Sequence, residues 1–109
     1  MLKSIFGNER KGNILLFIYT NGESYPTEIG RAFGYYLNSV QNQLFNLERD
    51  GVVYSKLKGK VRLFGLNPRY PFKQELTAFL EKSLTFVPQE EKERLYTPRL
   101  RPRLSRKPL

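Results

Sequence analysis

The feature that most restricts the fold is a stretch with helical periodicity, Asn38 to Asp50, which ends at Gly51. Apolar residues recur in it at i, i+4 and i+7, the spacing that places side chains on one face of a helix. These residues are Val40, Leu44 and Leu47. Most of the other side chains in the stretch are polar. The pattern therefore predicts an amphipathic helix with one face in a core and the opposite face in solvent.

Two runs of β-branched and aromatic residues, Val52 to Leu57 and Lys60 to Leu66, follow this helix directly. They meet across Lys58-Gly59, where glycine can adopt the positive φ of a tight turn, so the runs predict a two-stranded antiparallel hairpin. No acidic residue occurs between Ser55 and Asn67. The hairpin carries four cations, which are Lys56, Lys58, Lys60 and Arg62.

Three further helices are expected from apolar patterns and helix-breaking residues. A short buried helix opens at Asn8 or Glu9 and ends at Asn21-Gly22, and a helix of about two turns runs from Pro26 to Gly34. A closing helix extends from Phe72 to Leu84. The predicted fold is mainly α with a small antiparallel β-hairpin, in the order helix, helix, helix, hairpin, helix. Two helices joined by a short turn and followed by a basic hairpin form the winged helix-turn-helix arrangement.

Composition changes near Phe86, and this change divides the chain. Residues 5–84 are expected to form the winged-helix domain. Residues 85–109 combine prolines and many charges with few apolar residues, the profile of a basic Pro/Arg-rich tail. The chain has 19 lysines and arginines against 10 acidic residues, a net charge of +9, and five of these charges lie between Pro98 and Leu109. We expect this last part to be extended.

Missing residue types exclude most enzyme and metal chemistry. The chain has no histidine and no cysteine, which removes thiolate and imidazole catalysis, disulfides, and metal ligation by these side chains. Its carboxylates come without a catalytic partner or a glycine-rich phosphate loop, so neither an enzyme nor a cofactor is expected. The longest apolar stretch, Ile14 to Tyr19, is far shorter than the roughly 20 residues that a membrane span needs. We expect a cytoplasmic protein without a metal or a membrane partner.

Several segments resemble a known family of regulators. Tyr25 to Gly34, Ser39 to Leu44 and Leu47 to Val53 look like the ArsR-like winged-helix transcriptional regulators. Leu2 to Asn8 and Phe64 to Phe72 are similar to winged-helix domains found beside minimal nucleotidyltransferases. The resemblance implies a DNA-binding regulator of transcription. It does not imply metal sensing, because the metal-sensing members rely on clusters of cysteine and histidine.

Two departures from the family pattern affect the helix pair. Tyr25 stands where the family usually has a serine or threonine cap, so either Ser24 replaces that cap or the cap is missing. Asn42 and Gln43 stand where many relatives carry arginine and histidine, so the guanidinium contact to guanine is absent from this helix. The base preference of the family therefore does not carry over to this chain.

Polar residues opposite the apolar stripe are the candidates for contact with DNA bases. Their amides and hydroxyl can both donate to and accept from base edges in the major groove, and amides pair well with adenine. The predicted base-contacting residues are Asn38, Ser39, Gln41, Asn42 and Asn46. Phosphate contacts are expected from cations on the hairpin and beside the helix pair. These cations are Arg31, Arg49, Lys56, Lys58, Lys60 and Arg62.

The expected function is sequence-specific binding of double-stranded DNA by a transcriptional regulator. A homodimer is expected, because one module of this size buries only roughly 600–1,000 Å² on DNA and two half-sites supply the missing specificity. The first helix and the helix from Phe72 to Leu84 are the segments left for the dimer interface. An alternative is a protein-interaction module that docks a nucleotidyltransferase or another partner. The hairpin cations could also serve only to protect an edge strand from aggregation.

Overall fold

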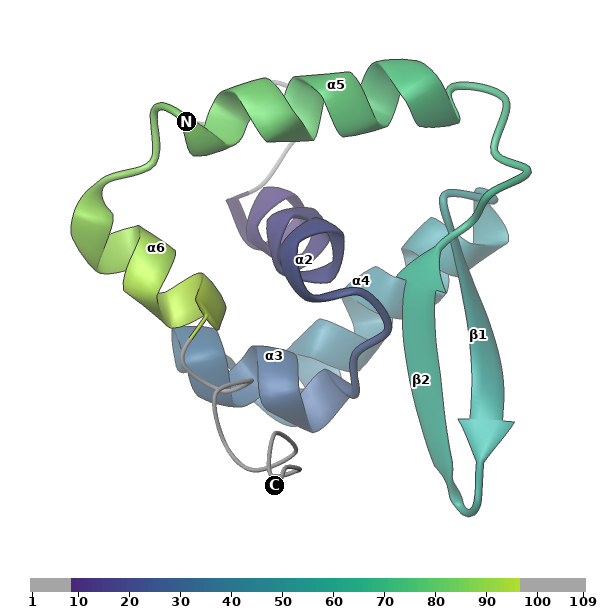
Figure 1. Ribbon diagram of the computed structural model, residues 1–109. Helices are drawn as coiled ribbons and strands as arrows, with labels where there is room; N and C mark the ends of the chain where they lie inside the picture. The colour runs from purple at the N-terminus through teal and green to yellow at the C-terminus, as the bar shows by residue number, and fades with distance from the viewer. Residues whose placement is uncertain (1–8, 97–109) are drawn as a thin grey trace, which may run out of the picture.

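The structure, a computed structural model, describes residues 9–96 of the chain. Within this range the elements, labelled as in Figure 1, are α2 (Glu9–Asn21), α3 (Pro26–Phe33), α4 (Leu37–Arg49), β1 (Val53–Lys58), β2 (Val61–Leu66), α5 (Lys73–Leu84) and α6 (Gln89–Tyr96). The described chain is mainly helical with one two-stranded antiparallel sheet. This confirms the predicted fold class and the predicted order of elements up to α5.

α2 lies at the centre of the fold, with the other helices and the hairpin arranged around it (Figure 1). Its residues Ile14 to Ile18 are each at most 3% exposed. A helix that is apolar on all sides must be covered on all sides, and α2 packs against α4, α5, α6 and β2. The structure thus contains the short buried helix predicted from the sequence. Because Ile14 to Ile18 are enclosed, this middle part of α2 is not available for the dimer contact that was expected of the helix.

The start of α3 lacks a side-chain cap. Tyr25 precedes the helix and its side chain makes no capping hydrogen bond. The hydroxyl of Ser24 donates instead to the carbonyl oxygen of Gly22 at 2.9 Å, so Ser24 does not replace the cap. The Glu28 carboxylate accepts a hydrogen bond from the backbone N–H of Tyr25 at 2.9 Å, which satisfies one free donor at this helix end. Of the two alternatives open from the sequence, the missing cap is the one observed.

A tight connection joins α3 to α4. Gly34 has a φ of 74°, and its N–H donates to the carbonyl oxygen of Gly30 at 2.8 Å. Gly34 ends α3 because its backbone adopts the left-handed conformation. A Cβ atom on Gly30 would lie 3.0 Å from the carbonyl oxygen of Tyr35, so a larger residue would press on the connection. Glycine at both positions lets α4 begin directly beside α3.

The hairpin of β1 and β2, called the wing below, turns one residue later than predicted. Lys58 pairs with Val61, so Gly59 and Lys60 form the turn, and Gly59 has a φ of 66°. The predicted turn at Lys58-Gly59 was therefore wrong by one residue, although glycine does supply the positive φ.

One backbone bridge fixes the wing to the helical part of the fold. Ser24, in the connection between α2 and α3, pairs with Phe64 on β2, and each N–H donates to the other residue's carbonyl oxygen at 2.9 Å. The Phe64 side chain is buried in the same core as α2 and α4. The wing is therefore held beside α4 by both backbone pairing and core packing.

The segment after α5 differs from the expected tail. Residues 89–96 form α6, which packs against α2, and Leu95 is 1% exposed. The carbonyl oxygen of Leu95 also accepts a hydrogen bond from the Asn21 side chain at 2.7 Å. One buried leucine among charged residues produces no apolar stripe, so composition alone indicated a tail where a helix forms. The cationic stretch from Pro98 to Leu109 lies outside the described residues.

Candidate nucleic-acid interface

α4 has one face in the core and a polar face in solvent. The buried residues are those of the predicted stripe, Val40, Leu44 and Leu47. The five residues predicted to contact bases are all exposed or partly exposed, namely Asn38, Ser39, Gln41, Asn42 and Asn46. The structure therefore brings these five side chains together on the outward part of one helix. Their contact with bases stays a prediction.

A shallow hollow marks the start of α4. Its lining combines the exposed ring of Tyr36 and the side chain of Leu37 with three of the predicted base-contacting residues, Asn38, Ser39 and Asn42. In helix-turn-helix proteins the N-terminal residues of the second helix are the ones that contact base edges. This shallow hollow thus lies at the end of α4 where such contacts are made.

The sequence-based prediction missed one exposed residue on the outward surface of α4. Phe45 is aromatic but 48% exposed, and its ring centroid lies 6.0 Å from that of Phe64 on β2. A signal was present in the sequence, because Phe45 directly follows Leu44 and so falls outside the stripe at i, i+4 and i+7. One part of the Phe45 ring contacts the wing and the other part faces solvent.

Two of the predicted phosphate-contacting cations are engaged within the protein. Lys56 forms an ion pair with Glu23, with 3.1 Å between Nζ and Oε2. Arg62 donates from Nη1 to the hydroxyl oxygen of Ser55 at 3.0 Å. Both cations are exposed, and each already has one partner within the protein that a phosphate would have to replace or share. The prediction treated all four wing cations alike, and the structure separates these two from the others.

Lys58 ends β1 and Lys60 is the second residue of the turn, so both lie at the tip of the wing, which extends away from the helices (Figure 1). Both are exposed, and neither takes part in an ion pair within residues 9–96. Like charges this close in sequence repel one another, and a polyanion relieves that repulsion. The tip is therefore the part of the wing best suited to bind a phosphate.

The remaining two cations flank the helix pair. Arg31 is exposed in the last turn of α3. Arg49 ends α4, its side chain is 72% exposed, and its Nε atom lies 3.8 Å from Oδ1 of Asp50. Exposed ion pairs of this kind contribute little to stability, so Arg49 can exchange Asp50 for a phosphate at small cost.

Two side-chain hydrogen bonds attach the wing to the helical part. The Ser55 hydroxyl on β1 donates to Oε2 of Glu48 on α4 at 2.6 Å, and the Tyr54 hydroxyl donates to the Glu23 carboxylate. A Cβ atom on Gly65, the cross-strand partner of Tyr54, would lie 2.6 Å from the Tyr54 hydroxyl oxygen. Glycine at this position therefore leaves the space that the Tyr54 side chain occupies on its way to Glu23.

These contacts shift two pKa values. The hydrogen bond from Tyr54, followed by that from Lys56, holds the pKa of Glu23 below its ordinary value of 4.5. Burial, with a further contribution from Glu23, raises the pKa of Tyr54 to about 12. At neutral pH Glu23 is therefore ionised and Tyr54 is protonated, the states in which they bind each other and Lys56.

The substitution Glu23→Gln is expected to make the stability of the protein less dependent on acidic pH. Because the pKa of Glu23 is lower in the folded chain, its contribution to stability is present above about pH 4.5 and is lost as the pH falls through the folded-state pKa. Denaturant unfolding at a series of pH values measures this. Tyr54→Phe removes the hydrogen bond that contributes most to the lowered pKa of Glu23, so it should also make stability less dependent on acidic pH. Equal pH dependence in all three proteins would contradict the assignment.

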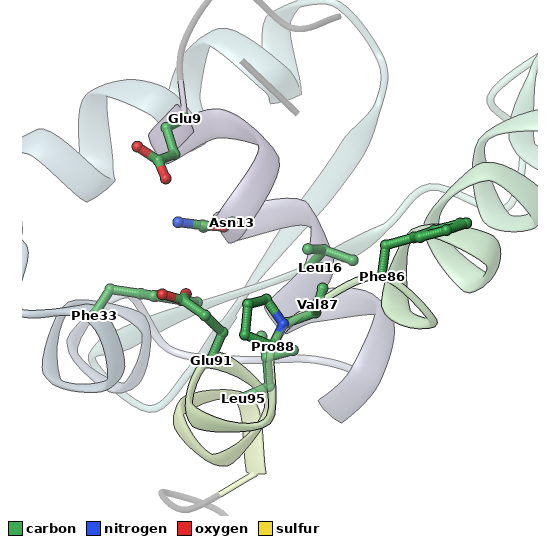
Figure 2. A pocket seen from close by; sticks show the side chains of 9 residues that line it. All are labelled: Glu9, Asn13, Leu16, Phe33, Phe86, Val87, Pro88, Glu91 and Leu95. Carbon is green, nitrogen blue, oxygen red and sulfur yellow. The ribbon is translucent and has the colours of Figure 1, made fainter. Parts of the chain in front are cut away.

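A separate cavity of about 340 Å³ lies where α2, α3 and α6 meet the connection between α5 and α6. Figure 2 shows the carboxylates of Glu9 and Glu91 beside it, with an apolar wall that includes Leu16, Phe33 and Leu95. The two carboxylates make its rim unfavourable for phosphate. This cavity is therefore not part of the candidate nucleic-acid interface.

Two other kinds of site do not occur within residues 9–96. This part of the chain contains no cluster of three or more acidic, histidine or cysteine side chains placed to hold a metal ion. None of its helices has the length and apolar character needed to cross a membrane.

Comparison with known proteins identifies the fold. No protein-family model and no curated protein matches the sequence. Among solved structures, the chain is similar to MepR, a transcription regulator of the Staphylococcus aureus multidrug efflux pump MepA, with a TM-score of 0.59 and 19% identity over 88% of this chain and 77% of that one. It is also similar to the transcriptional regulator Tm0710 from Thermotoga maritima, with a TM-score of 0.57 and 20% identity over 96% and 82% of the two chains.

A third similar structure is an S. aureus MepR variant bound to an oligodeoxyribonucleotide, with a TM-score of 0.53 and 20% identity over 88% of this chain and 77% of that one. At these identities the likeness concerns the fold. It does not extend to the ArsR-like resemblance of the sequence, which stays a prediction. Together with the order α3, α4, wing, these comparisons show that the chain has the winged helix-turn-helix fold.

Proposed function

We propose that this protein is a sequence-specific, double-stranded DNA-binding regulator of transcription, as its resemblance to the ArsR-like regulators implies, and that it acts as a homodimer in the cytoplasm. The observation that carries the proposal is the outward surface of α4. It combines five polar side chains that can bind base edges with a neighbouring wing whose tip bears two lysines without an ion pair in residues 9–96. The MepR variant bound to an oligodeoxyribonucleotide supports the proposal, because its fold is similar to that of this chain.

In this proposal α4 enters the major groove. A helix of 13 residues is about 20 Å long, and the groove is about 12 Å wide, enough for an α-helix and its side chains. The exposed amides of Asn38 and Asn42 would face base edges from the first half of α4. Asparagine and glutamine amides bind adenine through N6 and N7, so these residues favour adenine over the other bases.

The wing tip would bind the DNA backbone beside the groove. Within the described part of the chain Lys58 and Lys60 form no ion pair, whereas Lys56 would first have to leave Glu23. Phosphate contacts of this kind add affinity for any duplex and carry no sequence information. In this proposal α4 therefore supplies the sequence specificity, and the wing tip supplies affinity for any duplex.

A homodimer would contact DNA through two copies of this surface. α5 is the best candidate for the interface, because large exposed apolar side chains lie just before and just after it: Phe72 is 61% exposed and Phe86 is 65% exposed. Burial of such residues against a second copy is favourable. A two-fold arrangement gives two related half-sites, which supply the specificity that one module lacks.

The alternative is a module that docks a nucleotidyltransferase or another protein. It predicts a different salt dependence of binding. Release of counterions from phosphates makes DNA binding weaken steeply as salt rises, whereas an apolar protein interface responds little. The basic wing tip favours the DNA-binding proposal over this alternative.

Replacement of Lys58 and Lys60 together by alanine tests the proposal. Binding of the full chain to duplex DNA should weaken on every sequence, and the slope of log K against log salt should become shallower by about 1.8, the value that corresponds to two phosphates. Fluorescence anisotropy with labelled duplexes at several salt concentrations measures the slope. Lys58→Arg with Lys60→Arg keeps both charges and should keep the wild-type slope. An unchanged slope in the alanine variant would mean that the tip does not touch phosphate.

A further inference from the structure

We infer that Phe45 binds the 5-methyl group of a thymine in the major groove, so that the outward surface of α4 selects A·T base pairs. This inference rests on the proposed function and deepens it by naming the class of DNA. It starts from the exposed aromatic ring that the core stripe of α4 does not use.

Phe45 lies on the surface predicted to face DNA. It follows Gln41 by four residues and Asn42 by three, and side chains at these spacings are neighbours along a helix. All three are exposed or partly exposed in the structure. A base pair that reaches the Asn42 amide is therefore within reach of the Phe45 ring as well.

Contact with the wing fixes the position of the ring. Its neighbour Phe64 is 1% exposed, and the two rings are tilted by 59° with 6.0 Å between centroids. Phe64 is held by core packing and by its backbone bridge to Ser24. The exposed part of Phe45 is thus a positioned apolar surface, which gives up little conformational freedom when it binds a ligand.

The chemistry of this surface matches both bases of an A·T pair. In the major groove adenine offers N7 and N6, which an amide binds, and thymine offers a methyl group, which an apolar side chain contacts. Guanine is read best by arginine, and in α4 the single arginine is the last residue, Arg49. The amides beside an aromatic ring therefore favour A·T pairs over G·C pairs.

Thymine-to-uracil substitution tests the inference on the wild-type protein. Uracil pairs as thymine does but has hydrogen in place of the methyl group. Starting from the preferred duplex, each thymine is replaced in turn. Affinity should fall about fourfold at one thymine of each half-site, as expected for one buried methyl group, and should stay unchanged at the others.

The substitution Phe45→Ala should abolish that difference, so that the thymine and uracil duplexes bind equally well. Leu57→Ala, which removes an exposed apolar side chain from β1 of the wing, is the control and should retain the fourfold preference, because contacts of the wing with phosphate carry no sequence information. Phe45→Leu keeps an apolar side chain and serves as the second variant if the alanine variant does not fold. Its preference should be reduced but still present.

The outcomes separate the inference from the proposed function. If the wild-type protein binds a preferred duplex but no uracil substitution weakens binding, the inference is wrong and the proposed function stands. If uracil weakens binding but Phe45→Ala keeps the full preference, another residue reads the methyl group and the inference is also wrong. If no duplex is bound at all, the proposed function itself fails.

Discussion

Replacement of Leu95 by alanine is expected to lower the free energy of unfolding by about 2–5 kcal/mol, the usual cost of removing a buried leucine side chain. Leu95 is 1% exposed, and α6 packs against the central helix α2. The substitution would leave a cavity between these helices that the surrounding chain fills only in part. Chemical denaturation of the wild-type and variant proteins measures the difference.

An exposed position on the same helix provides the control. Gln89→Ala changes a solvent-facing residue at the start of α6 and should alter stability by less than about 0.5 kcal/mol. If Leu95→Ala is as mild as this control, residues 89–96 contribute nothing to the folded domain and behave as the tail that composition suggested. The predicted destabilisation instead makes α6 an integral part of the fold.

Replacement of both Gln41 and Asn42 by alanine is expected to weaken binding to the preferred duplex by about 1–3 kcal/mol for each amide that binds a base. The substitutions remove two amides from the outward surface of α4 and leave the buried residues Val40 and Leu44 in place. Binding to a scrambled duplex should change much less, because phosphate contacts do not depend on these amides. Titration of both duplexes at one salt concentration measures the two effects.

Gln89→Ala serves as the control for this pair as well. It removes an exposed amide from α6, away from the proposed DNA surface, and should leave binding to both duplexes unchanged. An equal weakening on the preferred and the scrambled duplex in the Gln41 and Asn42 variant would contradict base reading by α4.

Much of the fold could be predicted because local patterns decided it. The stripe in α4 specified its buried face, and the apolar run in α2 specified a helix that must be enclosed. Two features of the fold were not predicted correctly from the sequence. Gly59 marked the wing turn but did not fix its register, because one glycine with positive φ fits more than one turn position. α6 was missed because Leu95 is the one residue among its described side chains that is buried, and because the helices against which α6 packs, α2 and α3, are distant in the sequence.

The sequence predicted most residues of the candidate site, but it did not predict all of their contacts. Helical spacing placed the polar side chains of α4 on the outside, where they are observed. The pairing of Lys56 with Glu23 could not be foreseen, because the two residues come from separate elements that only the folded chain brings together. Phe45 was overlooked for a related reason: its contact with Phe64 depends on how the wing packs beside α4.

Selection of binding sites from random duplex DNA by the full chain tests the central claim most directly. The account predicts enrichment of one sequence motif with two related half-sites, rich in A·T pairs where α4 would lie, and disappearance of that motif when Gln41 and Asn42 are both replaced by alanine. Recovery of unselected sequences by the wild-type protein, or the same motif from the alanine variant, would contradict the claim that the outward surface of α4 reads DNA bases.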